Sequence, residues 1–168
     1  MRRHLFLSFA LAVFAVPALA QADCKVFYDA SDNLMNVPHR LFTTMKSPSG
    51  GEKTRESIFV DGASYIQLGG KWEKSRMTAK DLHDVELENR KTNTNISCKI
   101  MRSEVVDGEP ATVYAVHSET EDVKTDATVW LSKTRGLVLR QEIDLGTEGH
   151  IALRYEYSNV TAPTILPK

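Results

Sequence analysis

Histidine and cysteine, the residue types that most often carry catalysis or bind metals, are sparse in this chain. Four histidines follow residue 20, and none falls at the His-Glu-x-x-His spacing of a zinc helix. They are His39, His83, His117 and His150. The sequence contains neither a Gly-x-Ser-x-Gly turn nor a phosphate-binding glycine loop. We therefore predict no catalytic residue, no metal site and no cofactor, and we expect that the protein is not an enzyme.

Two acidic clusters could attract a cation. Acidic residues surround His83 at positions 81, 84 and 86, and a second acidic run covers 119–122. The simpler interpretation is a solvated helix face for the first cluster and an exposed loop for the second. A loose metal site, or a hydrolase that acts through His83 or His117, stays open as an alternative.

The two cysteines, Cys24 and Cys98, predict a disulfide, because an even number of cysteines in an exported chain normally pairs. In the chain-entropy model, a bond that closes a loop of about 75 residues stabilises the fold by roughly 4 kcal/mol. Redox catalysis would usually need a Cys-x-x-Cys motif, which is absent. The bond would hold the start of the mature chain beside the strand that contains Cys98.

Residues 1–20 have the pattern of a secretory signal peptide. Two arginines precede an apolar run over 5–16, and small residues at Ala18 and Ala20 mark a cleavage site after Ala20. The apolar run is shorter than the ~20 residues that a membrane-spanning helix needs. We expect a soluble periplasmic protein whose mature chain, 21–168, forms a single domain.

Composition excludes several classes of protein. The chain has 21 Lys+Arg against 22 Asp+Glu, a formal net charge of -1, whereas nucleic-acid binders normally carry a basic excess. Hydrophobic residues make up 42% and charged residues 26%, which are ordinary values for a globular domain. We therefore expect no nucleic-acid partner.

The spacing of apolar residues predicts two helices, over 24–37 and 78–89, within a chain that otherwise alternates as β-strands. In the second helix, Thr78 is a good N-cap, and Leu82, Val85 and Asn89 are expected to face inward. The predicted strands cover 40–46, 54–60, 64–68, 71–74, 96–106, 111–118, 125–132, 137–145 and 151–160. In the last strand, Ile151, Leu153, Tyr155 and Tyr157 share one face, which indicates a sheet with one dry side.

These elements predict a mainly β, α+β fold. Eight to nine antiparallel strands would form a curved sheet or incomplete β-barrel, because twist accumulates along a long sheet. The two helices would cover its concave face. A crevice between the helices and the sheet would be the natural ligand site.

A hairpin motif in the last third of the chain resembles the LolA/LolB superfamily of periplasmic lipoprotein carriers. Residues 130–140, Trp-Leu-Ser-Lys-Thr-Arg-Gly-Leu-Val-Leu-Arg, look like the family pattern W-x-(S/D)-x-x-x-G-L-P-L-R, with Val138 where the family often has proline. The closing segment 154–160 adds to the resemblance. The resemblance implies a periplasmic branch of this fold with a hydrophobic cavity that accommodates lipid.

Aromatic residues are the candidates for lining such a cavity, and Met77 could form part of a flexible rim. The candidate set is Tyr65, Trp72, Met77, Tyr114, Trp130, Tyr155 and Tyr157. Ordinary core packing is the alternative explanation for all of them.

The predicted function is the binding of a lipid, acyl chain or other hydrophobic ligand, with lipid or lipoprotein carriage in the cell envelope as its specific form. The alternative is a non-catalytic structural or interaction module with a filled core. The expected partners are accordingly a hydrophobic small molecule or lipid, or envelope proteins, and the protein is expected to be a monomer.

Overall fold

The computed structural model describes residues 21–22, 24–92, 95–120 and 124–165. The predicted signal peptide, 1–20, lies outside the described residues. Helices and strands occur close to their predicted positions. They are β1 Gln21–Ala22, α1 Lys25–Leu34, β2 His39–Lys46, β3 Glu52–Val60, β4 Ala63–Leu68, β5 Lys71–Lys74, α2 Ala79–Thr92, β6 Asn95–Val106, β7 Glu109–Glu119, β8 Lys124–Ser132, β9 Val138–Asp144, the 3-10 helix η1 Gly146–Glu148, and β10 His150–Glu156.

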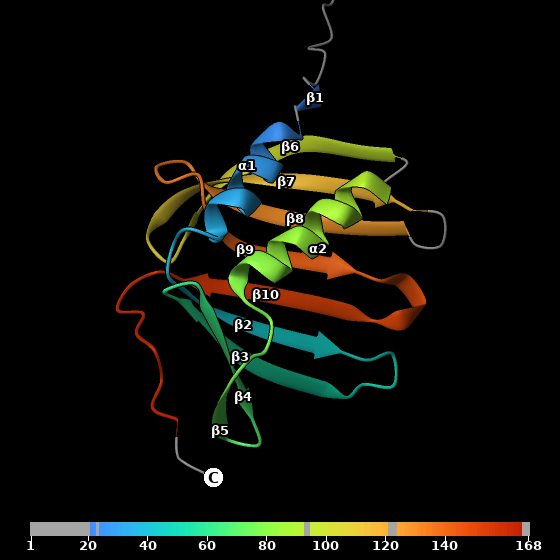
Figure 1. Cartoon of the computed structure of the whole chain (residues 1–168). Coiled ribbons are helices and arrows are strands. Elements are labelled where there is room, and N and C mark those ends of the chain that lie inside the picture. Colours follow the sequence, from blue (N-terminus) through green and yellow to red (C-terminus); the bar gives the residue numbers. More distant parts are fainter. Residues whose placement is uncertain (1–20, 23, 93–94, 121–123, 166–168) are drawn as a thin grey trace, which may run out of the picture.

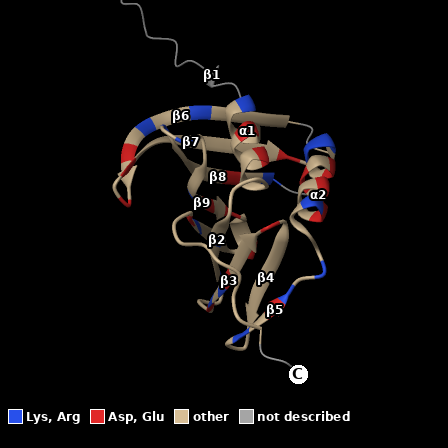
Figure 2. Cartoon of the chain, turned by 60° about the vertical axis from the view of Figure 1, so that its left-hand side comes forward, with Lys and Arg blue, Asp and Glu red and all other residues tan. Residues whose placement is uncertain are grey.

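All ten strands in the described part of the chain belong to one antiparallel sheet (Figure 1). The strand order is β1-β6-β7-β8-β9-β10-β2-β3-β4-β5, so the C-terminal meander meets the N-terminal one where β10 pairs with β2. The sheet is curved and open, with β1 and β5 at its edges (Figures 1 and 2). The fold class is the predicted one, and the strand that the sequence did not predict is the two-residue β1.

Two predicted hairpin turns have the backbone that their residues favour. Asp61 and Gly62 have φ of 52° and 71°, and Asp107 and Gly108 have φ of 50° and 85°. Positive φ at both central residues is the type I′ pattern, whose twist matches that of the flanking strands. These turns fix the β3–β4 and β6–β7 registers.

Helix α1 and the disulfide close one end of the sheet. Phe27, Ala30 and Leu34 lie on one face of α1, and the side chains of Ala30 and Leu34 are buried against the strands. Cys24, just before the helix, is bonded to Cys98 of β6, and their Cα atoms are 5.3 Å apart. The predicted disulfide is confirmed, and β1 pairs with β6 beside it.

Helix α2 begins with a reciprocal cap. The Asp81 carboxylate accepts hydrogen bonds from the Thr78 backbone N–H at 2.7 Å and from its hydroxyl at 2.8 Å. The Asp81 N–H donates to the Thr78 hydroxyl oxygen at 3.2 Å. These bonds to Thr78 lower the pKa of Asp81. The predicted N-cap is therefore confirmed, with aspartate in the place of the usual glutamate.

The predicted inward face of α2 is wrong in part. Val85 is 50% exposed and Asn89 is exposed, whereas Leu82 is half-buried as expected. The less exposed positions of α2 are Ala79, Leu82, His83, Glu86 and Arg90. No helix in the described part of the chain is long and apolar enough to cross a bilayer.

Candidate functional site

Both helices lie over one face of the sheet, and alternation along each strand determines which side chains point toward them (Figure 1). Val129 and Leu131 of β8 form one buried cluster with Ala30 and Leu34 of α1, so these positions define the helix-facing side. On β10, Tyr155 packs against the same cluster. The remaining positions follow from the strand registers.

The half of this face beneath α1 is filled. Its buried cluster combines α1 with strands β6 to β9, and every member is at most 8% exposed. The members are Ala30, Leu34, Cys98, Val116, Val129, Leu131 and Val138. The described residues of this half therefore form a packed core beneath α1.

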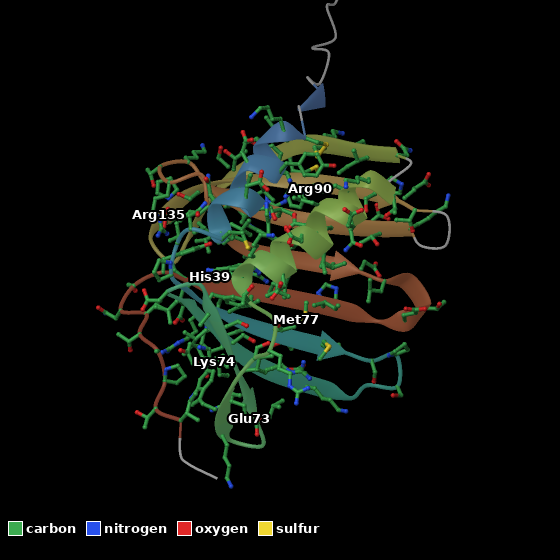
Figure 3. The ribbon with its side chains drawn as sticks, in the orientation of Figure 1. His39, Glu73, Lys74, Met77, Arg90 and Arg135 are labelled. Atoms are coloured by element: carbon green, nitrogen blue, oxygen red, sulfur yellow. A yellow bond between two sulfur atoms is a disulfide. The ribbon has the colours of Figure 1, made fainter. Side chains whose placement is uncertain are left out.

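Polar contacts join α1 to α2. Ser31 of α1 donates a hydrogen bond to Glu86 of α2 at 2.5 Å. The Arg90 guanidinium lies 2.8 Å from Asp32 and 2.6 Å from Glu86 (Figure 3). We call Tyr28, Ser31, Asp32, His83, Glu86 and Arg90 the interhelical polar cluster.

The interhelical polar cluster is partly withdrawn from water. The Arg90 side chain is 16% exposed, and its guanidinium lies 4.6 Å from the centre of the Tyr28 ring. His83 Nδ1 is 3.9 Å from Asp32. Burial alone would lower the pKa of Arg90, but hydrogen bonds to Asp32 and Glu86 outweigh it and raise that pKa. The inward side of α2 is thus polar because it faces the polar side of α1.

An aliphatic surface continues past α2 on the same side of the sheet. Ile151 and Leu153 of β10 share the face of Tyr155, and their register partners are Met45 and Thr43 of β2. Ile151 also lies opposite Ile143 of β9. We call Leu41, Met45, Ile143, Ile151 and Leu153 the apolar track.

The apolar track remains partly exposed. All five of its side chains have intermediate exposure, and none belongs to either buried cluster. A cleft of about 420 Å³ at one end includes Met45 and Ile151. A second cleft, of about 310 Å³, includes Tyr155 and Tyr157. At ~3.3 Å per residue, β10 spans about 13 Å between Ile151 and Tyr155, and this length of strand separates the two clefts.

Tight packing of aromatic rings closes the far end of the track. His39 is 3% exposed, stacks on Phe59 with centroids 4.6 Å apart, and lies 5.9 Å from the Tyr155 ring. Burial lowers the pKa of His39, which favours the neutral imidazole. Its Nδ1 lies 2.9 Å from the Val37 carbonyl, so the Nδ1–H of the neutral ring donates a hydrogen bond to that oxygen. Burial also raises the pKa of Tyr155 and of Tyr157, whose hydroxyl donates to the Val138 carbonyl. These groups pack as neutral rings.

Three of the predicted cavity residues lie on the helix-facing side. Tyr114, Tyr155 and Tyr157 are partly buried and pack against the cluster beneath α1. Met77 lies just before α2 and is 41% exposed (Figure 3). Its carbonyl accepts a hydrogen bond from the Ser64 hydroxyl at 2.7 Å.

The other three aromatic residues point to the opposite face. Trp130 stands between Val129 and Leu131, so its ring faces away from the helices, under Arg140 at 4.9 Å. Its indole N–H donates to Glu104 at 2.6 Å. Tyr65 and Trp72 alternate with residues whose side chains face the helices, and they lie on that outer face too. The structure therefore does not gather the seven predicted residues into one pocket.

The sequence contained part of the signal for the apolar track. The alternation of Ile151, Leu153 and Tyr155 indicated a dry face, and the structure places all three toward the helices. Their partners on β2 were missed, because pairing between segments about 110 residues apart leaves no local pattern.

The acidic residues around His83 do not gather as metal ligands in the described ranges. His83 faces Asp32 within the interhelical polar cluster, whereas Asp81 caps α2. No three histidine, cysteine, aspartate or glutamate side chains of the described residues converge as a metal ion would need. The run 119–122 lies partly outside the described residues.

Searches for sequence relatives returned nothing: no family model and no curated protein matches the chain. Solved structures do match. MucB in complex with MucA(peri) has a TM-score of 0.50 and 16% identity, over 82% of this chain and 56% of that one. The lipoprotein LppX of Mycobacterium tuberculosis has a TM-score of 0.46 and 14% identity, over 83% and 99%. A LolA superfamily protein of Nitrosomonas europaea has a TM-score of 0.25 and 9% identity, over 79% and 90%.

The match to MucB, the strongest of the three by TM-score, shows that the two proteins share a fold, and this chain spans little more than half of MucB. At such identities the matches describe architecture alone. Function has to be argued from the surface of this chain.

Proposed function

We propose that this protein binds an acyl chain or another apolar ligand along the apolar track, in the periplasm after removal of residues 1–20. The observation that carries the proposal is the contrast along one continuous face. The seven members of the buried cluster beneath α1 are at most 8% exposed, whereas the side chains of the track, including Met45 and Leu153, are all partly exposed. A soluble protein that leaves such a row open has a reason to keep it accessible.

The expected affinity follows from the area that a ligand would cover. Burying about 200 Å² of apolar surface contributes roughly 5 kcal/mol before the cost of association is subtracted. Binding to the open track alone would therefore be weak. A ligand that α2 also covered would be held more tightly.

Helix α2 is suited to adjust to such a ligand. Its contacts with α1 are polar, and its surface carries both signs of charge beside the uncharged strand β4 (Figure 2). Moving α2 would expose little of the buried core, since among its described residues only Ala79 is buried. In this proposal α2 covers the ligand and no catalytic step takes place.

Lipid extraction and native mass spectrometry of the purified protein test the proposal, followed by titration with hexadecanol. The variant Leu153→Asn should weaken hexadecanol binding at least fivefold. Ala152→Asn is the matched control, because Ala152 neighbours Leu153 on the other face of β10 and should leave binding unchanged. Absence of bound lipid together with absence of hexadecanol binding would refute the proposal.

A second candidate function is docking to an envelope protein, because MucB, which shares the fold, was solved with MucA(peri). Among the described residues, no strand pairs with the outer side of the edge strand β5. Co-purification of a protein partner by a lipid-free preparation, lost on deletion of β5, would favour docking over lipid binding.

A further inference from the structure

Strand β3 sorts its charges by face. Residues 52–56 read Glu-Lys-Thr-Arg-Glu, so alternation puts the two acids on one side of the strand and the two bases on the other. The acids, Glu52 and Glu56, share the face of Ile58, which points away from the helices. The bases, Lys53 and Arg55, share the face of Ser57, whose register partner Leu41 belongs to the apolar track.

The outer acids are neutralised within the sheet. Glu52 lies 3.4 Å from Lys46, and Glu56 lies 3.1 Å from Arg40. Both bases come from β2, the neighbouring strand. The outer face of this hairpin is therefore balanced, and it has no charge left to offer a ligand.

The helix-facing bases have no such partner. No carboxylate of the described residues lies within 4.0 Å of Lys53 or Arg55, the distance at which the outer pairs form. Both side chains are exposed. Two like charges thus stand two residues apart on the open half of the face.

These two bases adjoin the apolar track. Lys53 lies opposite Met45 in the β2–β3 register, and Arg55 lies opposite Thr43, which is in turn opposite Leu153. Lys53 also lines the 420 Å³ cleft together with Met45 and Ile151. An aliphatic surface is thus bordered along one side by cations.

The remaining charges of that cleft do not cancel the two bases. Lys46 and Glu52 neutralise each other. In the described part of the chain, Glu148 of η1 is the one other acid that lines the cleft. One acidic charge is thus set against two basic charges, Lys53 in the cleft wall and Arg55 next to the cleft. His150 completes the set of titratable lining groups.

We propose that the ligand is an anionic amphiphile, whose tail lies on the apolar track and whose carboxylate or phosphate headgroup pairs with Lys53 and Arg55. This inference rests on the proposed function and specifies its ligand class. A guanidinium and an ammonium beside an apolar surface favour such a molecule, because each forms charge-assisted hydrogen bonds while the tail leaves water.

Titrations with palmitate, hexadecyl phosphate and hexadecanol test the headgroup separately from the tail. In the variant Lys53→Gln/Arg55→Gln, the Kd for palmitate and hexadecyl phosphate should rise roughly tenfold, the sum of two exposed ion pairs. The Kd for hexadecanol should stay unchanged. Raising the salt concentration should weaken the two anions and leave the alcohol unaffected.

Lys74→Gln/Lys99→Gln is the matched control, since it removes the same charge from the outer face, and it should alter none of the three affinities. Equal affinity of wild type for palmitate, hexadecyl phosphate and hexadecanol would overturn the headgroup inference and leave the proposed function standing. Equal losses in the control would also overturn it. Failure of all three to bind would refute the proposed function itself. Selective binding of one anion would tell a carboxylate site from a phosphate site.

Discussion

The two halves of the helix-facing surface are built from the same kind of strand and end in different states. Beneath α1, Val129 and Leu131 are 0% and 3% exposed, because an amphipathic helix lies on them and a disulfide fixes the start of that helix. Along β10 and β2, Leu153 and Met45 alternate just as regularly and stay partly exposed. The alternation along each strand therefore determines which side chains face the helices. The covering helix then determines which of these side chains become buried.

The contrast extends to the way each helix is held. Helix α1 contributes apolar side chains to the core, whereas α2 is joined to α1 by the interhelical polar cluster. Apolar packing loses stability whenever the contact opens, but polar groups on a moving helix regain hydrogen bonds from water. The covered half is therefore held by apolar packing, whereas α2 is held by polar contacts.

Removing the disulfide is the strongest way to break this contrast. Cys24→Ser/Cys98→Ser should lower the free energy of unfolding by roughly 4 kcal/mol, since the unfolded chain regains the freedom of a loop of about 75 residues. Urea unfolding with and without reductant measures the loss. A variant as stable as the oxidised wild type would show that α1 is held by packing alone.

The same truncation in each half sharpens the contrast. Leu131→Ala should cost about 3 kcal/mol, because it leaves a cavity in the filled core. Leu153→Ala should cost about 1 kcal/mol or less, because its side chain is already partly in water. Equal losses in chemical denaturation would mean that the track is part of the core.

Substitution of Arg90 tests the attachment of α2. Arg90→Leu leaves Asp32 and Glu86 without their counter-ion and should destabilise the protein by about 1–2 kcal/mol, less than a fully buried pair would lose. Amide hydrogen exchange should become faster in α2 before it does in α1. The control Lys91→Leu removes an exposed partner of Glu88 and should cost less than about 0.5 kcal/mol.

Titration separates His39, which is buried at the packed end of the track, from His117, whose side chain is 33% exposed. Burial lowers the folded-state pKa of His39, so the unfolded chain binds a proton first as pH falls below the ordinary value of 6.5. His39→Gln should therefore reduce the loss of stability between pH 7 and pH 5.

His117 should behave in the opposite way. Hydrogen bonds to Asp126 and Glu119 raise its pKa, so its contribution is complete below pH 6.5 and is lost as pH rises through the folded-state value. In His117→Gln, unfolding measured across pH 5 to 9 should show a smaller gain toward acid. Parallel pH profiles for both variants would contradict the assignment.

Local patterns were sufficient for much of the fold. Asp-Gly turns, a proline after α1 and period-two alternation located nearly every strand, and the two cysteines predicted their own bond. Each of these signals acts over a few residues or allows one pairing. The candidate site was harder, because Trp130, Tyr65 and Trp72 were chosen by residue type, whereas their face depends on strand parity.

The prediction of the inward face of α2 was wrong in part for a related reason. An apolar stripe through Val85 is the ordinary expectation for a helix on a sheet, but α2 turns Glu86 and Arg90 inward because Ser31 and Asp32 of α1 lie there. A polar partner more than fifty residues away leaves no trace in the sequence of the helix itself.

The pairing of β10 with β2 also constrains the order of assembly. The hairpins β2–β3 and β8–β9 form between neighbours, yet the seam between the two meanders needs a strand that ends at Glu156. Until β10 has been synthesised, β2 lacks the neighbour that joins the two meanders. A sheet with such distant contacts forms slowly. A nascent chain of this topology therefore cannot complete the middle of its sheet until β10 has emerged from the ribosome.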